Sequence, residues 1–231
     1  MKKIYFLLFT LAALTAHSQT ADEIISKHIE ARGGLEKLRA LQTMIMEGSM
    51  VQQGTDVAMK YYYAHNKGTK VEFSAVGQTG YNIITPTEGW TFNPFAGGTS
   101  AEPMPEAQQK EQAGNLDLAG PLVDYKTKGH TVEYLGKQNI QGADFYKLKL
   151  TRKNGKVTTY YFDKNYLAAQ VVTTALIQGS EQEVTTEYSD FRKTPEGYTI
   201  PFKRTSGGNE ITFDKVEINP KIEDAVFKPS N

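Results

Sequence analysis

The side chains that could carry chemistry are few and lie far apart in this sequence. Its four histidines are His17, His28, His65 and His130, and none of them has the spacing of a metal-binding motif such as HExxH or HxH. Cysteine is absent, which excludes a thiol nucleophile and a cysteine metal site. No GxSxG motif is present, and the Gly97-Gly98 pair lacks the following lysine of a phosphate-binding loop. We therefore expect a protein that is not an enzyme and holds no cofactor or metal.

Apolar and aromatic side chains are the remaining candidates for a functional site. The stretch from Gly89 to Val123 contains the only tryptophan, Trp90, and a helix-like run from Pro105 to about Ala119. Its glycines and prolines disfavour packing into one rigid state, so we interpret it as a lid over an apolar cavity. The alternative is a helix that simply covers one face of a sheet. The residues predicted to bind a lipid, in the cavity and the lid, are Tyr61, Tyr63, Phe73, Tyr81, Trp90, Phe92, Phe95, Met104, Leu116 and Leu118.

Helices and strands around this stretch must position those side chains. From Ala21 to Leu41 apolar residues recur at helical spacing, which predicts a helix to about Arg32, a stop at Gly33-Gly34 and a second short helix. His28 lies on or beside the apolar stripe and is interpreted as a histidine at the edge of the core. From Thr43 onwards, short apolar runs separated by turn residues predict about eleven strands in antiparallel hairpins. The predicted fold class is α+β: a strongly curved antiparallel sheet, an incomplete β-barrel, with helices covering the concave face.

The start of the chain reads as an export signal. Lys2 and Lys3 precede an apolar run that is too short to span a bilayer, and Ala16-His17-Ser18 has the form of a cleavage site. We predict a signal peptide over residues 1–18 and one domain over residues 19–231. Without a cysteine there is no lipobox, so we expect a soluble monomer in the periplasm.

The charge balance argues against a nucleic-acid partner. The chain has 26 basic and 26 acidic residues and a formal net charge of zero. A neutral chain without basic clusters is a poor candidate for binding nucleic acid.

A series of short motifs extends along nearly the whole chain after residue 18. They are Ala31-Arg-Gly-Gly-Leu35, Gly89-Trp90 with Pro94, Leu118-Ala-Gly-Pro-Leu-Val-Asp-Tyr-Lys126, Gly129-His130 with Gly136, Tyr160-Tyr-Phe-Asp163, Ile200-Pro201, and Ile218-Asn-Pro220 with Phe227 and Pro229. In this order the motifs resemble the LolA/LolB-like periplasmic lipoprotein carriers, the outer-membrane lipoprotein-sorting proteins of Bacteroidetes type.

The resemblance implies a half-barrel whose hydrophobic cavity takes the acyl chains of lipoproteins, gated by a helical lid, and a shuttle through the periplasm without chemistry. Its partners would be an acylated lipoprotein or lipid, an inner-membrane release complex and an outer-membrane acceptor. The carrier proper holds its lid closed with an arginine on an early strand, whereas residues 43–93 contain no arginine here.

Two alternative functions remain compatible with the same pattern. One is an envelope sensor or protein-interaction module with the same fold. The other is a hydrolase, which would need a buried pair of a histidine and a carboxylate around His65 or His130.

Overall fold

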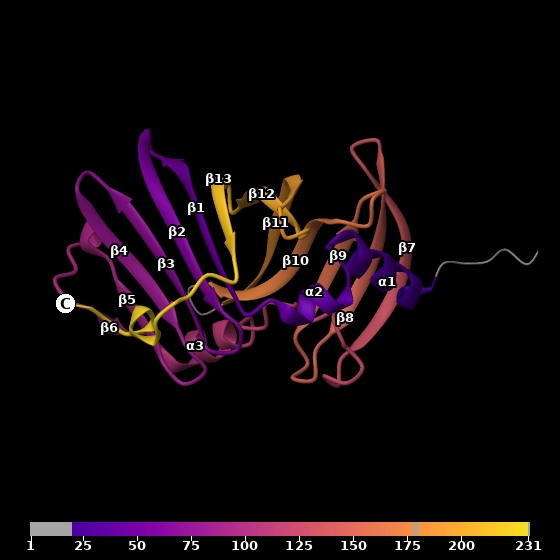
Figure 1. The fold of residues 1–231 in the computed structure, drawn as a ribbon, viewed down its shortest axis with the longest axis horizontal. Helices are drawn as coiled ribbons and strands as arrows, with labels where there is room; N and C mark the ends of the chain where they lie inside the picture. The colour runs from indigo at the N-terminus through magenta and orange to yellow at the C-terminus, as the bar shows by residue number, and fades with distance from the viewer. Residues whose placement is uncertain (1–19, 178–179, 231) are drawn as a thin grey trace, which may run out of the picture.

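One curved antiparallel sheet makes up most of the protein (Figure 1). The computed structural model describes residues 20–177 and 180–230, so the predicted signal peptide lies outside the described residues. Within them the sheet has 13 strands. The strands are β1 Thr43–Gln52, β2 Thr55–Ala64, β3 Gly68–Ala75, β4 Gln78–Ile84, β5 Gly89–Phe92, β6 Glu102–Pro103, β7 Thr131–Ile140, β8 Ala143–Thr151, β9 Val157–Phe162, β10 Ala168–Ile177, β11 Ser180–Lys193, β12 Thr199–Ser206 and β13 Asn209–Ile218.

The predicted fold class is confirmed, and the strand count is slightly higher than expected. One strand that the sequence pattern does not predict is β6, which pairs with β5 through only two residues, Glu102 and Pro103. A two-residue strand has no alternation of apolar and polar side chains, so the period-2 pattern that predicts strands cannot detect it.

The strand order shows how the chain fills the sheet. Strands β1 to β6 run in sequence to one edge, and β7 to β13 run from the other edge back to the middle, where β13 pairs with β1. The chain must therefore pass from one edge of the sheet to the other between β6 and β7. We call this part, residues 104–130, the crossover segment.

Two short helices precede the first strand: α1, Ala21–Ala31, and α2, Leu35–Ala40. A capping box begins α1, in which Glu23 N–H donates to Thr20 Oγ1 and Thr20 N–H donates to a Glu23 carboxylate oxygen. Gly33, with φ of 123°, and Gly34, with φ of 95°, separate the helices in conformations that few other residues adopt. The predicted helix, glycine stop and second helix are thereby confirmed.

Apolar side chains of α1 and α2 pack on the concave face and form two core clusters. Leu38 of α2 joins the cluster over β1, β2 and β13, while Ile24 and Ile25 of α1 join the cluster over β8 and β9. All three side chains are at most 4% exposed. Burying a side chain of this size contributes roughly 1.5–3 kcal/mol, so this packing holds both helices on the sheet.

The crossover segment is less helical than expected. Its helix, α3, spans only Glu106–Ala113, because Gly114 ends it and turns follow as far as Gly129. Gln109 is the one buried residue of α3, and its side chain donates to the Thr85 carbonyl at 2.8 Å. The helix thus lies at the end of β4, at the lower edge of the sheet in Figure 1, and has no apolar face to lay over a cavity.

Turns after α3 carry the apolar part of the crossover segment onto the concave face. Ala119 and Val123 enter the core cluster of α2, and Leu122 enters the cluster of α1. The cover of the concave face is therefore α1, α2 and these turns. None of the helices among the described residues is long and apolar enough to span a bilayer.

Candidate functional site

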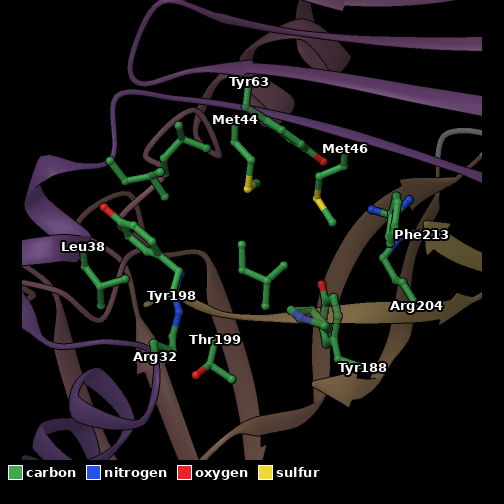
Figure 2. Close-up of a pocket in the computed structure, with 14 residues that line it drawn as sticks. Arg32, Leu38, Met44, Met46, Tyr63, Tyr188, Tyr198, Thr199, Arg204 and Phe213 are labelled. Carbon is green, nitrogen blue, oxygen red and sulfur yellow. The ribbon is translucent and has the colours of Figure 1, made fainter. Parts of the chain in front are cut away.

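Between the concave face and its cover lies a cavity of about 210 Å³, which we call the apolar cavity (Figure 2). Methionine, leucine and aromatic side chains form most of its wall. The lining residues are Arg32, Leu38, Leu41, Met44, Met46, Tyr63, Leu118, Tyr188, Tyr198, Thr199, Ile200, Pro201, Arg204 and Phe213. Methionine side chains are flexible and fill irregular spaces, so this wall can adapt to an apolar guest.

Two further cavities adjoin the first along the same face. The central cavity, of about 240 Å³, lies beside His28 and Arg32, and the polar cavity, of about 660 Å³, lies beside Lys128 and Arg152. Tyr188 of β11 lines all three cavities. Side chains therefore divide one groove into three compartments, and binding sites of a few hundred Å³ are typical for small ligands.

Strand pairing explains why these side chains meet. Tyr188 pairs with Arg204 across β11 and β12, and Val171 pairs with both Tyr160 and Thr186 across its two neighbours. Directly paired residues of an antiparallel sheet point to the same face. The middle strands thus present a row of mixed polar and apolar side chains to the groove.

Buried tyrosines keep their protons in this groove. Burial raises the pKa of Tyr160 to about 12 and also raises the pKa values of Tyr63 and Tyr188. Their phenol groups are therefore neutral at physiological pH and can donate hydrogen bonds to a guest.

Three arginines reach the groove from different elements. Arg32, the C-terminal cap of α1, donates to the Ala119 carbonyl at 3.0 Å and thereby ties the crossover segment to the helix. Arg204 donates to the Tyr61 hydroxyl at 2.8 Å. Burial lowers the pKa of Arg32, because a buried guanidinium lacks the water that stabilises its charge. The third, Arg152 beyond the end of β8, donates to the Gly114 carbonyl at 2.7 Å.

Asp117 organises the polar cavity. Its carboxylate accepts a hydrogen bond from Lys128 Nζ at 2.5 Å, and its Oδ1 lies 3.6 Å from His65 Nδ1. That nitrogen also accepts a hydrogen bond from the Leu118 backbone N–H at 3.2 Å, and 3.6 Å is too long for a hydrogen bond between the ring and the carboxylate. His65 thus fixes the crossover segment, and this geometry does not make the histidine–carboxylate dyad that a hydrolase would need.

His28 is a core histidine, as the sequence indicates. Its Nδ1 lies 2.8 Å from the Tyr166 carbonyl, which can only accept, and its ring lies 4.8 Å from that of Phe162. Burial, with a smaller effect of the Arg32 charge, lowers the pKa of His28 to about 3. The ring is therefore neutral. Within residues 20–177 and 180–230 no group of three or more histidines or acidic residues could hold a metal ion.

The structure distributes the ten predicted lipid-binding residues over several places. Tyr63 and Leu118 line the apolar cavity, and Tyr61 lies beside it in the same core cluster. Phe73 and Phe95 line a separate cavity of about 430 Å³ near the β1–β2 turn, with their ring centres 6.0 Å apart.

The other five predicted residues lie away from these cavities. Tyr81, Trp90 and Phe92 form a cluster with the C-terminal residues Val226 and Phe227. They point to the convex face. Trp90 pairs with Ile83, and Ile83 aligns through β3 with Tyr62 of β2. Tyr62 points away from the concave face, which Tyr61 and Tyr63 occupy. The remaining two, which form a cluster at the lower end of β4, are Met104 and Leu116.

Sequence reasoning did not identify the polar residues of the groove. Arg32 belongs to a motif that carries the family resemblance, but Arg152, Tyr188 and Arg204 stand in strand patterns that read equally well on either face. For Tyr188 and Arg204, the register of β11 with β12 decides which face the side chains occupy, and no short motif encodes that register.

Comparison with known proteins identifies the fold. No protein-family model and no curated protein sequence matches the chain. Among solved structures, a domain assigned to outer membrane lipoprotein sorting from Vibrio parahaemolyticus is 13% identical with a TM-score of 0.55, over 89% of this chain and 94% of that one. A DUF1329 family protein from Desulfovibrio piger is 13% identical with a TM-score of 0.59, over 91% and 98%.

A LolA superfamily protein from Nitrosomonas europaea is 15% identical with a TM-score of 0.56, over 91% of this chain and 98% of that one. Each likeness extends over nearly the full length of both chains, so it concerns the whole sheet and its cover. At such identities a likeness shows the fold alone, and that fold is the one of the LolA superfamily and of outer-membrane lipoprotein-sorting domains.

Proposed function

We propose that this protein is an exported, non-enzymatic carrier or binding protein that holds the acyl chain of a lipid or an acylated lipoprotein in the groove of its concave face. The observation that carries the proposal is the apolar cavity between the sheet and α2, lined by Met44, Met46, Leu38 and Phe213. The signal peptide predicted from the sequence would place the protein in the periplasm. A domain of the same fold from Vibrio parahaemolyticus is assigned to outer membrane lipoprotein sorting, which supports the proposal.

Physical chemistry supports an acyl chain as the guest. Each buried methylene contributes roughly 0.8 kcal/mol, so a chain held over several carbons gains enough to bind well. Side-chain contacts hold the turns of the cover to the helices: Arg32 donates to the Ala119 carbonyl, Tyr125 and Lys126 donate to Asp22 of α1, and Arg39 of α2 pairs with Asp124. A cover made of turns can move without unfolding a long helix.

The test is native mass spectrometry of the protein purified from its own cell envelope. We expect adducts whose masses match a lipid or an acylated lipoprotein. Met46→Trp, which fills the apolar cavity, is expected to remove most of the adduct. The matched control is Val51→Trp on the same strand, where the side chain is 65% exposed and outside the groove.

Protein that carries no lipid adduct, or a Met46→Trp variant that carries as much as Val51→Trp, would contradict the proposal. A co-purifying protein without any acyl group would instead favour the envelope sensor considered above.

A further inference from the structure

Positive charge is concentrated in the groove. The three cavities are lined by four cationic side chains, Arg32, Lys128, Arg152 and Arg204, and by one carboxylate, Asp117, which gives a formal charge of +3. The whole chain has a formal net charge of zero. The excess is therefore local to the surface where the guest would bind.

In the part of the chain that the structure describes, the three arginines donate hydrogen bonds only to neutral groups. Arg32 donates to a backbone carbonyl, Arg152 donates to another, and Arg204 donates to a phenol oxygen. Among the described residues none of these three forms an ion pair. Placing unpaired guanidinium groups in a partly buried groove costs free energy, and a bound anion would offset that cost.

Within the groove, the polar cavity has the largest unused capacity for hydrogen bonds. Arg152 Nε and Thr158 Oγ1 are buried atoms with no hydrogen-bond partner in the structure. Thr158 is only 1% exposed, and both residues line the polar cavity. Buried polar atoms are nearly always paired, so two unpaired ones in one cavity indicate a ligand that supplies acceptors.

Donors around this cavity suit a group with several oxygens. Lys128 Nζ already contacts Asp117 and the Gly120 carbonyl, and a third proton on the same nitrogen remains for a ligand. Thr173 adds a hydroxyl group to the wall, whereas the Thr186 hydroxyl there already donates to Ser206 Oγ. A phosphate ester has three exposed oxygens and negative charge, and guanidinium groups recognise it well.

We propose that the natural guest is an anionic amphiphile. Its phosphate headgroup occupies the polar cavity beside Arg152 and Lys128, and its acyl chain passes Tyr188 into the apolar cavity. This inference rests on the proposed function, because it assigns a headgroup to the same acyl-binding groove. It adds that the protein selects its guest by charge.

The test compares two ligands that differ only in the phosphate: dodecanoyl lysophosphatidic acid and monododecanoylglycerol. Each displaces the neutral fluorophore N-phenyl-1-naphthylamine from the full chain, with inorganic phosphate as a third ligand. We expect the phosphorylated ligand to bind at least about tenfold more tightly than the neutral one, the scale of one charge-assisted contact. Inorganic phosphate is expected to displace no fluorophore and to bind only weakly in calorimetry.

Variants locate the headgroup. Arg152→Gln is expected to remove most of the preference for phosphate and to leave the affinity for monododecanoylglycerol unchanged. The matched control is Arg192→Gln, because Arg192 lies on the same sheet, pairs with Asp190 and lines none of the three cavities. If Arg152→Gln folds poorly, Thr158→Val provides an independent test, because it removes one hydroxyl and keeps the side-chain shape. We expect it to reduce the preference for the phosphorylated ligand by less than Arg152→Gln would.

Each outcome decides between the two proposals. Equal affinities for the two amphiphiles would overturn the charge selection and leave the proposed function standing. Failure of both amphiphiles to bind would overturn the proposed function itself. Inorganic phosphate that binds as tightly as the lysophosphatidic acid would overturn the amphiphile in favour of free phosphate as the ligand.

Discussion

The hydroxyl of Tyr61 on β2 accepts a hydrogen bond of 2.8 Å from Nη2 of Arg204 on β12, and the guanidinium carbon lies 5.2 Å from the centre of the Tyr61 ring. Two strands, β1 and β13, lie between these residues in the sheet. The contact therefore crosses the seam where the two halves of the sheet meet.

Tyr61→Phe is expected to lower the free energy of unfolding by about 1–2 kcal/mol, because it leaves the Arg204 guanidinium without its acceptor. Urea denaturation measures the effect. The matched control is Tyr63→Phe, because Tyr63 lies in the same groove (Figure 2). The Tyr63 hydroxyl has no hydrogen-bond partner among the described residues, so removing that hydroxyl should change the free energy of unfolding by less than about 0.5 kcal/mol. Equal effects of the two changes would rule out the seam contact as a source of stability.

His28 should make stability depend on pH. Its folded-state pKa is about 3, below the ordinary value of 6.5, so the unfolded chain binds more protons between these values. The contribution is fully present above pH 6.5 and is lost as the pH falls towards 3, with a slope of up to about 1.4 kcal/mol per pH unit.

Denaturation between pH 6.5 and about 5 isolates this effect, since carboxylates titrate mainly below that range. In His28→Asn the side-chain amide can still donate to the Tyr166 carbonyl but does not titrate, so the slope should be smaller. Burial and neighbouring cations also lower the pKa of His130, which contributes in the same direction and remains in both proteins. Identical slopes in the wild type and the variant would show that His28 is not the source.

Phe227 should stabilise the convex face without affecting the groove. Its ring is 8% exposed and packs in the cluster of Ile83 and Trp90. Phe227→Ala is expected to cost about 3–5 kcal/mol and to shift the emission of Trp90, the only tryptophan, to longer wavelength. Ligand affinity should stay the same at temperatures where the variant is folded, and a loss of affinity would place part of the site on the convex face. Phe95→Ala, at a side chain that is 44% exposed, serves as the control for ring removal.

Gly48 should tolerate no side chain. A Cβ there would lie 2.1 Å from the Thr212 carbonyl oxygen, at the point where the register of β1 and β13 shifts. Gly48→Ala is expected to lower the free energy of unfolding by more than about 2 kcal/mol, because the clash is with backbone. Gly114→Ala, where the nearest atom is at 3.4 Å, should change the melting temperature little. A stable Gly48→Ala variant would mean that the two strands can separate at the bulge.

Local chemistry made much of the fold predictable. Gly33-Gly34 marks the break between α1 and α2, and the Asn154-Gly155 turn lies where β8 gives way to β9. These features depend on a few adjacent residues and on their backbone preferences, which the sequence shows directly.

Which face each aromatic residue occupies could not be predicted in the same way. Tyr63 and Trp90 both stand in alternating strands, yet one faces the groove and the other lies under the C-terminal residues. Both faces of β2 to β5 are covered by apolar groups, so hydrophobicity does not distinguish them. The assignment depends on strand register and on a tail more than a hundred residues away in the chain, for which no local pattern exists.

The strand order has a consequence for how quickly the protein folds. Within β1 to β6, and within β7 to β13, every pairing joins strands that are neighbours in the sequence, so each half can form by closing short loops. The pairing of β1 with β13 joins positions as distant as Met44 and Ile218, and it has to wait for the largest loop closure in the molecule. We expect the seam to form last and to set the folding rate, and the groove, which spans that seam, to be absent from any half-folded chain.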